Sequence, residues 1–225
     1  MTKGILFYSD CILSPNFVEI VAKYISASGF HITSVTLSPM DFGKNILFEG
    51  ERSYVTMFKQ IQRGLEEMTE DVIFFAESDV LYHPSHYEFV PVKDNVYYYN
   101  GNYWVLRLED GFAIHYDLTP LSGLVAYREP LLTHFKERNA FIKRRNWGLA
   151  LGFEPFTHDR YKWKDWYDAD YFYPEFPNID IVHGANYTQK KFRWKNFLKK
   201  PAFWVEGNIN TIPGWPDLPK ILEGI

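Results

Sequence analysis

The stretch Asp71-Val-Ile-Phe-Phe-Ala-Glu-Ser-Asp79 is an apolar run that ends in two acidic residues one position apart. A short aliphatic and aromatic run of this kind predicts a buried strand. Side chains alternate along a strand, so Glu77 and Asp79 would lie on one side, and a turn starting at Glu77 would bring them closer. Carboxylate oxygens are the ligands that Mg²⁺ and Mn²⁺ prefer, so the pair is a candidate cation site. Acid pairs are also frequent at solvated strand ends, and this one alone is a weak signal.

The segments before this stretch alternate between strand and helix patterns. Ser14 and Pro15 are typical of a helix start, and Gly29 is typical of a helix end. The order β-α-β-α-β predicts an α/β fold with a parallel sheet, helices on both faces, and ligands beyond the carboxyl ends of the strands. The predicted elements are a strand over 5–8, a helix over 14–28, a strand over 31–37, a loop over 38–45, a helix over 53–68 and a strand over 72–76.

The second half is less periodic. Strand composition covers 95–108 and 122–127, and 129–144 reads as a helix that carries several basic residues. The stretch 153–177 is dense in aromatic, proline and acidic residues, which favours a packed irregular segment that shapes a substrate cleft. Residues 99–104 either form part of an acceptor wall or are an ordinary strand and turn. We expect one domain, with one half over 1–90 and the other over 91–225.

Composition narrows the class of protein. The chain has 225 residues, 46% of them hydrophobic and 19% aromatic, which is ample for a core and also suits the stacking of sugars or bases. Its net charge of −4 argues against bulk attraction to nucleic acid or an anionic membrane. One cysteine, no secretion signal in 1–10 and no apolar run near the length of a membrane span predict a cytosolic, soluble protein.

Several blocks of the sequence, in order, are similar to known motifs. The stretch from Pro177 to Thr188 is similar to Pro-x-Ile-Asp-Ile-Arg-His-Gly-x-Asn-Leu-Thr, with Val182 in place of Arg and Tyr187 in place of Leu. The stretch 76–82 is similar to Ala-Glu-Asp-Asp-Val-Leu-Tyr, with Ser78 in place of the central Asp. The loop 42–46 and the helix segment 58–61 resemble a Gly-x-Asn-Ile loop and a Tyr-x-Gln-Ile helix. Together these blocks resemble a family of small bacterial and phage glycosyltransferases with a GT-A type fold. In that reading, 1–90 is the nucleotide-sugar-binding half and 91–225 is the acceptor-binding half, with a C-terminal metal and phosphate segment.

The resemblance implies a transferase that moves a sugar from a nucleotide diphosphate, with a UDP-sugar as the expected donor, to a hydroxyl acceptor. It implies Mn²⁺ or Mg²⁺ on Glu77 and Asp79, with His183 as third ligand. Neutral imidazole suits Mn²⁺, although His183 is alternatively a hydrogen-bonded structural residue. The metal would stabilise the leaving diphosphate. Ser78 removes one negative charge from the family's pattern, so metal affinity would be lower.

Other residues are candidates for binding the donor. Asp10 follows the first strand, where nucleosides bind in this architecture, but it could equally cap a loop. Basic residues with interleaved aromatics fill 189–200 and suit a diphosphate, a nucleic-acid backbone or a solvated surface. The donor-binding candidates are Asp10, Lys44, Asn45, Asn186, Lys190, Lys191 and Arg193.

An inverting transferase needs a carboxylate that deprotonates the acceptor hydroxyl. Glu154 and then Asp159 are the favoured candidates, because they follow a glycine-containing turn region expected near the cleft. Either could equally be a surface acid, and a retaining mechanism would need no such base.

The alternatives differ in class. The acceptor is expected to be a saccharide, with 5-hydroxymethylpyrimidine in phage DNA as the minority case. A non-catalytic sugar- or nucleic-acid-binding module would explain the aromatic content without chemistry. A nucleotidyltransferase would share the carboxylate and metal chemistry, but 8–11 reads Tyr-Ser-Asp-Cys where a glycine-rich, lysine-containing phosphate loop would stand.

Overall fold

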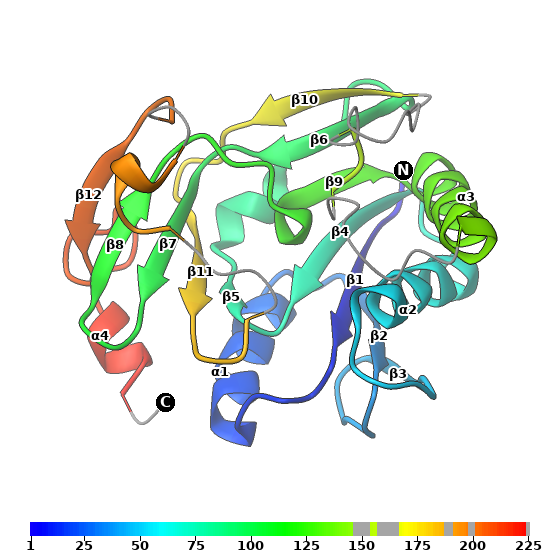
Figure 1. The fold of residues 1–225 in the computed structure, drawn as a ribbon, viewed down its shortest axis with the longest axis horizontal. Helices are drawn as coiled ribbons and strands as arrows, with labels where there is room; N and C mark the ends of the chain where they lie inside the picture. Colours follow the sequence, from blue (N-terminus) through cyan, green and yellow to red (C-terminus); the bar gives the residue numbers. More distant parts are fainter. Residues whose placement is uncertain (146–153, 157–166, 187–190, 198–200, 224–225) are drawn as a thin grey trace.

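The structure is a computed structural model that describes residues 1–145, 154–156, 167–186, 191–197 and 201–223. Within these ranges the chain forms two sheets, of seven and five strands, with helices packed against the larger one (Figure 1). The expected mixed α/β class is confirmed.

The larger sheet begins as a parallel sheet. Strand β1 pairs in parallel with β2 and β4, and β2 pairs in parallel with β3. Strand β9 is antiparallel to both β4 and β6, and β10 is parallel to β6. Strands β10, β6, β4 and β1 therefore all point the same way. The order is β10-β6-β9-β4-β1-β2-β3, with bounds β1 Lys3–Ser9, β2 His31–Thr36, β3 Lys44–Leu47, β4 Val72–Glu77, β6 Val96–Asn100, β9 Leu124–Tyr127 and β10 Asp168–Phe172.

The smaller sheet is built mostly from the second half of the chain. Strand β7 is central, antiparallel to β8 and parallel to β11, which is in turn antiparallel to β5. The short strand β5 follows β4 directly, so the acidic turn at 77–79 joins the two sheets. The order is β12-β8-β7-β11-β5, with bounds β5 Val80–Leu81, β7 Tyr103–Arg107, β8 Phe112–His115, β11 Asn178–Val182 and β12 Val205–Asn208.

Helices lie on both faces of the larger sheet, as expected. Helix α1 (Pro15–Ser26) contributes Phe17, Val21 and Ile25 to one core cluster. Helices α2 (Tyr54–Glu67) and α3 (Arg128–Arg145) cover the opposite face and contribute to a second cluster. The short helical segments are η1 Pro84–Glu88, η2 Leu121–Gly123, η4 Trp194–Asn196 and α4 Leu218–Ile221.

Local sequence explains where the two N-terminal helices begin. Ser14 accepts a hydrogen bond from the Phe17 backbone N–H, and Pro15 occupies the first turn. Ser53 caps α2 in the same way, accepting from the Thr56 backbone N–H. Helix α2 packs closely on the sheet through Gly64, because a Cβ there would lie 2.2 Å from Leu6 Cδ1.

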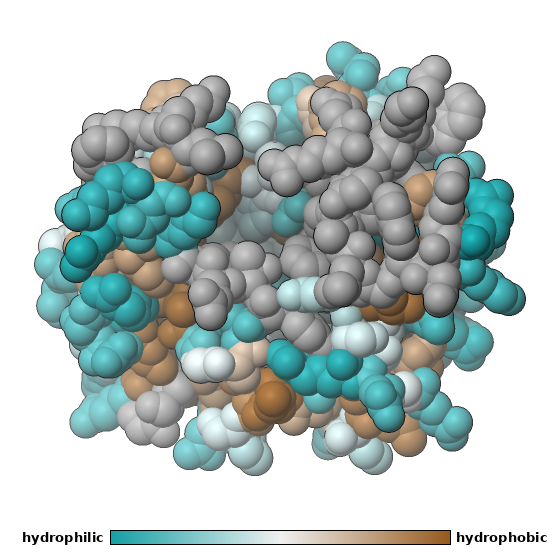
Figure 2. Space-filling model, in the orientation of Figure 1, coloured by the Kyte–Doolittle hydropathy of each residue, from teal (hydrophilic) through white to brown (hydrophobic). Residues whose placement is uncertain are grey.

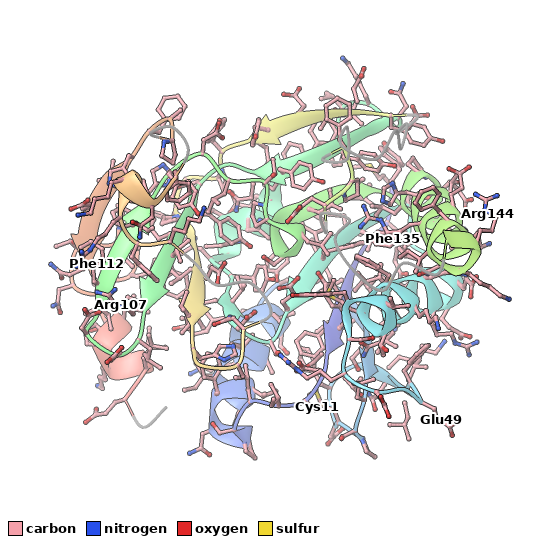
Figure 3. All side chains as sticks on the ribbon, in the orientation of Figure 1. Cys11, Glu49, Arg107, Phe112, Phe135 and Arg144 are labelled. Atoms are coloured by element: carbon pink, nitrogen blue, oxygen red, sulfur yellow. The ribbon has the colours of Figure 1, made fainter. Side chains whose placement is uncertain are left out.

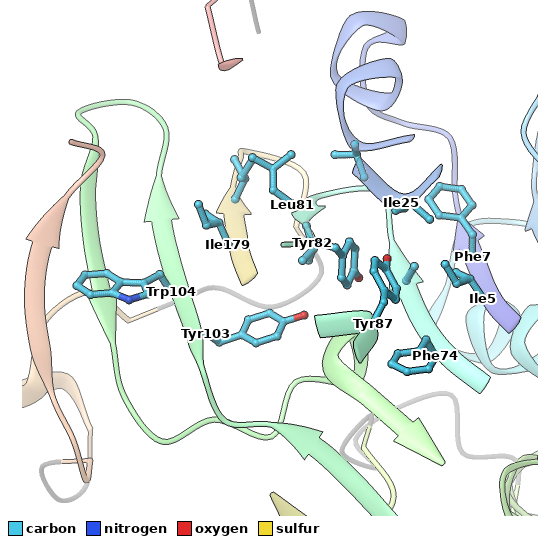
Figure 4. Close-up of a cluster of buried hydrophobic side chains, with 14 of the residues drawn as sticks. Ile5, Phe7, Ile25, Phe74, Leu81, Tyr82, Tyr87, Tyr103, Trp104 and Ile179 are labelled. Carbon is cyan, nitrogen blue, oxygen red and sulfur yellow. The ribbon is translucent and has the colours of Figure 1, made fainter. Parts of the chain in front are cut away.

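A tyrosine-rich core joins the two sheets. Figure 4 shows Tyr82 and Tyr87 between Phe74 of the larger sheet and Tyr103 of the smaller one. The Tyr82 hydroxyl donates to the Ser122 carbonyl and accepts from the Glu77 backbone N–H. Burial raises the pKa of Tyr82 well above its ordinary value, and the neighbouring Tyr103 and Glu77 raise it further. The Tyr82 phenol therefore stays neutral and fixes the end of β4 through the Glu77 backbone N–H.

The structure refines two parts of the sequence prediction. The expected loop 38–45 leads into β3, which begins at Lys44, and the single strand expected over 95–108 is two strands, β6 and β7, in different sheets. Tyr99, Tyr103 and Trp104, considered for an acceptor wall, are buried. The segment expected to be irregular, 153–177, contains β10.

On the face shown in Figure 2, hydrophobic residues are interspersed with hydrophilic ones across the described surface. Within the described ranges, no helix has both the length and the apolar character that a membrane crossing requires.

Candidate active site

A pocket lies at the carboxyl ends of β1 and β4. Five segments contribute its polar side chains: the end of β1 through Asp10, Arg52 just before the N-cap of α2, Gln60 of α2 itself, the acidic turn at the end of β4, and the turn after β11. Figure 3 marks Cys11 on the loop that follows β1, one residue beyond Asp10. The main polar residues of the pocket are Tyr8, Asp10, Arg52, Glu77, Asp79, His183 and Asn186.

Glu77 is held by a tyrosine from the neighbouring strand. The Tyr8 hydroxyl donates to Glu77 Oε1 at 2.5 Å, and the two residues are register partners in the β1–β4 ladder. Burial raises the pKa of Tyr8 well above its ordinary value, and the Glu77 carboxylate raises it further. Tyr8 is therefore a neutral donor that fixes one carboxylate oxygen.

Asp79 is held by the turn that follows β11. Asn186 Nδ2 donates to Asp79 Oδ2 at 2.9 Å, and Asn186 Oδ1 accepts from the His183 backbone N–H at 2.7 Å. His183 Nε2 lies 3.5 Å from Asp79 Oδ2. The structure thus brings Asp79, His183 and Asn186 together, although His183 is 104 positions after Asp79 in the sequence. Glu77 lines the same pocket.

Ser78 points into the structure between these two acids. It is buried, and its hydroxyl lies 3.1 Å from the Ser9 hydroxyl, which itself accepts from the Cys11 backbone N–H. This hydrogen bond joins the ends of β4 and β1. A hydroxyl satisfies this buried position without charge, whereas a carboxylate would have to be desolvated there.

Arg52, which sequence reasoning did not single out, connects the two sides of the pocket. Its Nε donates to Asp10 Oδ2 at 2.6 Å, and its guanidinium also donates to the Ala185 carbonyl at 2.5 Å. In the sequence, the one local indication of a role for Arg52 was its position just before the Ser53 helix cap. Among the described residues that line the pocket, three carboxylates, Asp10, Glu77 and Asp79, face one guanidinium and one imidazole.

The other candidates lie in different places. Lys44 forms an ion pair with Glu67 at 3.0 Å on the surface. Asn45 lies on β3, and its side chain bonds the Ser34 and Thr36 hydroxyls of β2 and the Met40 backbone N–H. Neither is among the residues that line the pocket.

The basic run and the candidate bases are only partly described. Lys191 is exposed with its ammonium 5.2 Å from the Phe197 ring centre, and Arg193 is exposed. Glu154 is half-buried, and the carbonyl of the next residue, Pro155, accepts from the Tyr99 hydroxyl at 2.7 Å. Asp159 and Lys190 lie outside the described residues.

The pocket offers the ligand chemistry of a hard cation, but its acids and histidine are bonded to other protein groups. Across the described ranges, no three His, Cys, Asp or Glu side chains are already grouped as metal ligands. His183 Nδ1 accepts from the Ala185 backbone N–H at 3.2 Å, so the neutral ring carries its proton on Nε2. Ligation through Nε2 would require the other tautomer, whereas the two carboxylates need no such change.

No family model and no curated protein sequence matches the chain. Among solved structures, it is similar to a glycosyltransferase involved in glycosylating the major capsid of PBCV-1 (TM-score 0.46, 12% identity, 77% of this chain and 82% of that one). It is also similar to the apo form of the glycosyltransferase GlyE of Streptococcus pneumoniae TIGR4 (0.45, 10%, 75% and 45%). A third is the inositol-1-phosphate CTP transferase of T. maritima (0.41, 11%, 82% and 91%). At such low scores and identities, these similarities assign neither a family nor an activity.

Proposed function

We propose that this protein is a divalent-metal-dependent glycosyltransferase of GT-A type, which moves a sugar from a nucleotide diphosphate to a saccharide hydroxyl. The observation that carries the proposal is the convergence of Glu77, Asp79 and Asp10 with His183 in one pocket at the carboxyl ends of parallel strands. The ordered blocks that resemble small glycosyltransferases include the acidic turn and the His-Gly turn that meet in this pocket.

The charge of the pocket supports a role for a metal. Three carboxylates against one guanidinium leave a net negative pocket when His183 is neutral. A diphosphate entering such a pocket alone would be repelled, whereas a divalent cation would be attracted and would reverse the balance. Glu77 and Asp79 would hold the ion, with His183 as the further ligand in its Nδ1–H tautomer.

The chemistry divides between the ion and the side chains. When bound, the ion supplies positive charge that offsets the charge developing on the leaving diphosphate. Tyr8 and Asn186 orient the two carboxylates through the hydrogen bonds described above. Asp10 lies where the nucleoside would bind, beside Arg52, and the Arg52 guanidinium can turn toward phosphate oxygens.

The remaining donor and acceptor assignments are also proposals. For an inverting transfer, Glu154 is the base that we favour, because the Tyr99–Pro155 bond anchors its segment to the α2/α3 face of the sheet, the face that also carries Tyr8. Lys191 and Arg193 are exposed cations that could contact the donor or a DNA acceptor.

Incubation of the purified chain with Mn²⁺ and a panel of nucleotide sugars tests the proposal. We expect binding and slow hydrolysis of at least one donor, and we expect EDTA to abolish both. Asp79→Asn should abolish hydrolysis, whereas Asp94→Asn, which removes an exposed carboxylate outside the pocket, should not. No binding or hydrolysis across the panel would refute the proposal. Transfer of labelled sugar to DNA containing 5-hydroxymethylcytosine, and not to saccharides, would change the acceptor class.

A further inference from the structure

Two tyrosines at the edge of the larger sheet expose their rings to solvent. Tyr171 lies on edge strand β10, and Tyr173 follows the end of that strand. Their exposed fractions are 36% and 65%, and the ring centres lie 6.3 Å apart with an angle of 27° between the planes. Adjacent, nearly parallel rings in water add little to the core, so their arrangement calls for another explanation.

The backbone around Tyr173 holds its ring in place. A Cβ on Gly101 would lie 2.4 Å from Tyr173 Cε1, so the ring rests directly against a glycine. The Gly101 backbone N–H donates to the Phe172 carbonyl, and Asn102 Nδ2 donates to the Pro174 carbonyl, each at 2.9 Å. The residues on both sides of Tyr173 are therefore tied to the β6–β7 turn, and the ring is ordered before any ligand arrives.

The tyrosine pair lies on the same face of the sheet as the candidate active site, and both stand at the carboxyl ends of their strands. Tyr171 is the register partner of Tyr99, which shares a core cluster with Tyr8 of the pocket. Strands β10 and β4 point the same way with two strands between them, so Tyr173 and Glu77 both stand at carboxyl ends. Three strand spacings place these ends about 14 Å apart along the sheet. That span suits a few linked sugar units.

The charges around the pair select the class of ligand. Burial and the neighbouring Asp117 carboxylate raise the pKa of Tyr171 to about 12, so its hydroxyl stays protonated. The exposed Asp117 carboxylate forms a hydrogen bond with that hydroxyl, so a negative charge lies beside the pair. Carboxylates beside flat aromatic faces accept hydrogen bonds from hydroxyl groups, and they repel phosphates. A neutral sugar fits this surface better than a nucleic acid does.

We propose that Tyr171 and Tyr173 form a platform that binds a neutral saccharide chain and presents its end to the pocket as the acceptor. The acceptor role depends on the proposed transferase function, whereas saccharide binding by the platform does not. Sugar rings would stack their C–H faces on the two phenol rings, and the Asp117 carboxylate would accept hydrogen bonds from sugar hydroxyls.

Binding of the full-length chain to an array of neutral glycans, without donor, tests the platform. The Tyr171→Ala/Tyr173→Ala double variant should bind its best glycan at least about tenfold more weakly, since about 1.4 kcal/mol or more is lost with the two aromatic contacts together. Tyr173→Trp should retain binding. Gly101→Ala, which displaces the ring without removing it, should weaken binding, and Val92→Ala, which truncates an exposed apolar residue elsewhere, should not.

Three results would overturn the platform: no neutral glycan bound by the wild type, equal binding by the double variant, or preference for basic peptides over glycans. Affinity for UDP with Mn²⁺ should be unchanged in the double variant, which keeps the pocket intact. If the wild type binds glycans through the tyrosines but binds no nucleotide, the transferase proposal fails and the platform stands.

Discussion

Replacing Arg52 by Gln should change the affinities for metal and nucleotide in opposite directions. Arg52 lies against Asp10 and is the guanidinium among three carboxylates that line the pocket. Removing its charge makes the pocket more negative, which favours a divalent cation and disfavours a diphosphate. We therefore expect Mn²⁺ alone to bind more tightly and UDP at saturating Mn²⁺ to bind more weakly.

The size of each change follows from Coulomb's law. Two unit charges about 8 Å apart interact by roughly 0.5 kcal/mol in water and by roughly 2 kcal/mol at an effective dielectric of 20. Arg52 is 37% exposed, so solvent screening favours the lower half of this range. A change of about 1 kcal/mol corresponds to roughly fivefold in each dissociation constant.

Isothermal titration at low ionic strength measures both affinities, and added salt should shrink both changes. Arg52→Lys keeps the charge and should leave Mn²⁺ affinity near that of the wild type. Arg63→Gln removes the same charge from the exposed face of α2, where Arg63 pairs with Glu67, and should change neither affinity. Metal and nucleotide affinities that move together in Arg52→Gln would show that the residue acts through the shape of the pocket and would refute the electrostatic reasoning.

Two predictions concern stability. Gly64→Ala should lower the free energy of unfolding by about 1–3 kcal/mol, because the new Cβ overlaps buried Leu6 and this outweighs the better helix propensity of alanine. The control Gly184→Ala places its Cβ where nothing lies within 4 Å, so it should be nearly neutral. Urea unfolding measures both changes. His86 is fully buried, and burial lowers its pKa from 6.5 to about 3. Between these pH values the unfolded chain binds one more proton than the folded chain does, so stability should fall as the pH drops from 6.5 toward 3. His86→Phe should flatten that slope in denaturant titrations across pH, and an unchanged slope would mean that other groups cause the acid sensitivity.

The N-terminal half of the fold could be predicted because its signals are local. Ser14, Pro15 and Ser53 mark helix starts through contacts within one turn, and the structure places both helices at those residues. Within 95–108, Asn100-Gly101-Asn102 is a turn signal, but the assignment of the two halves to different sheets was not predictable. Which sheet a strand joins depends on distant partners such as β10 and β11, and periodicity carries no such information.

In the candidate site, too, local features could be predicted from the sequence and long-range contacts could not. The position of Glu77 and Asp79 at a strand end follows from an apolar run, and the nearness of His183 to Asp79 agrees with the block resemblance. Arg52 could not have been singled out, because its partners Asp10 and Ala185 lie 42 and 133 positions away. The exposed pair Tyr171 and Tyr173 could not be singled out either, because it lies in a segment whose aromatic residues share no clear period.

The hydrogen bond between Asn186 and Asp79 has a consequence for how the protein is made. It closes a separation of 107 positions, and the turn that supplies it follows β11, late in the chain. Contacts of such long range form slowly, because a large loop must be ordered first. During synthesis, β1, β2 and β4 can leave the ribosome and pair well before Asn186 is added. A nascent chain thus carries its acidic turn in an unfinished pocket, and ligand binding should begin only when the β11 segment has emerged and docked.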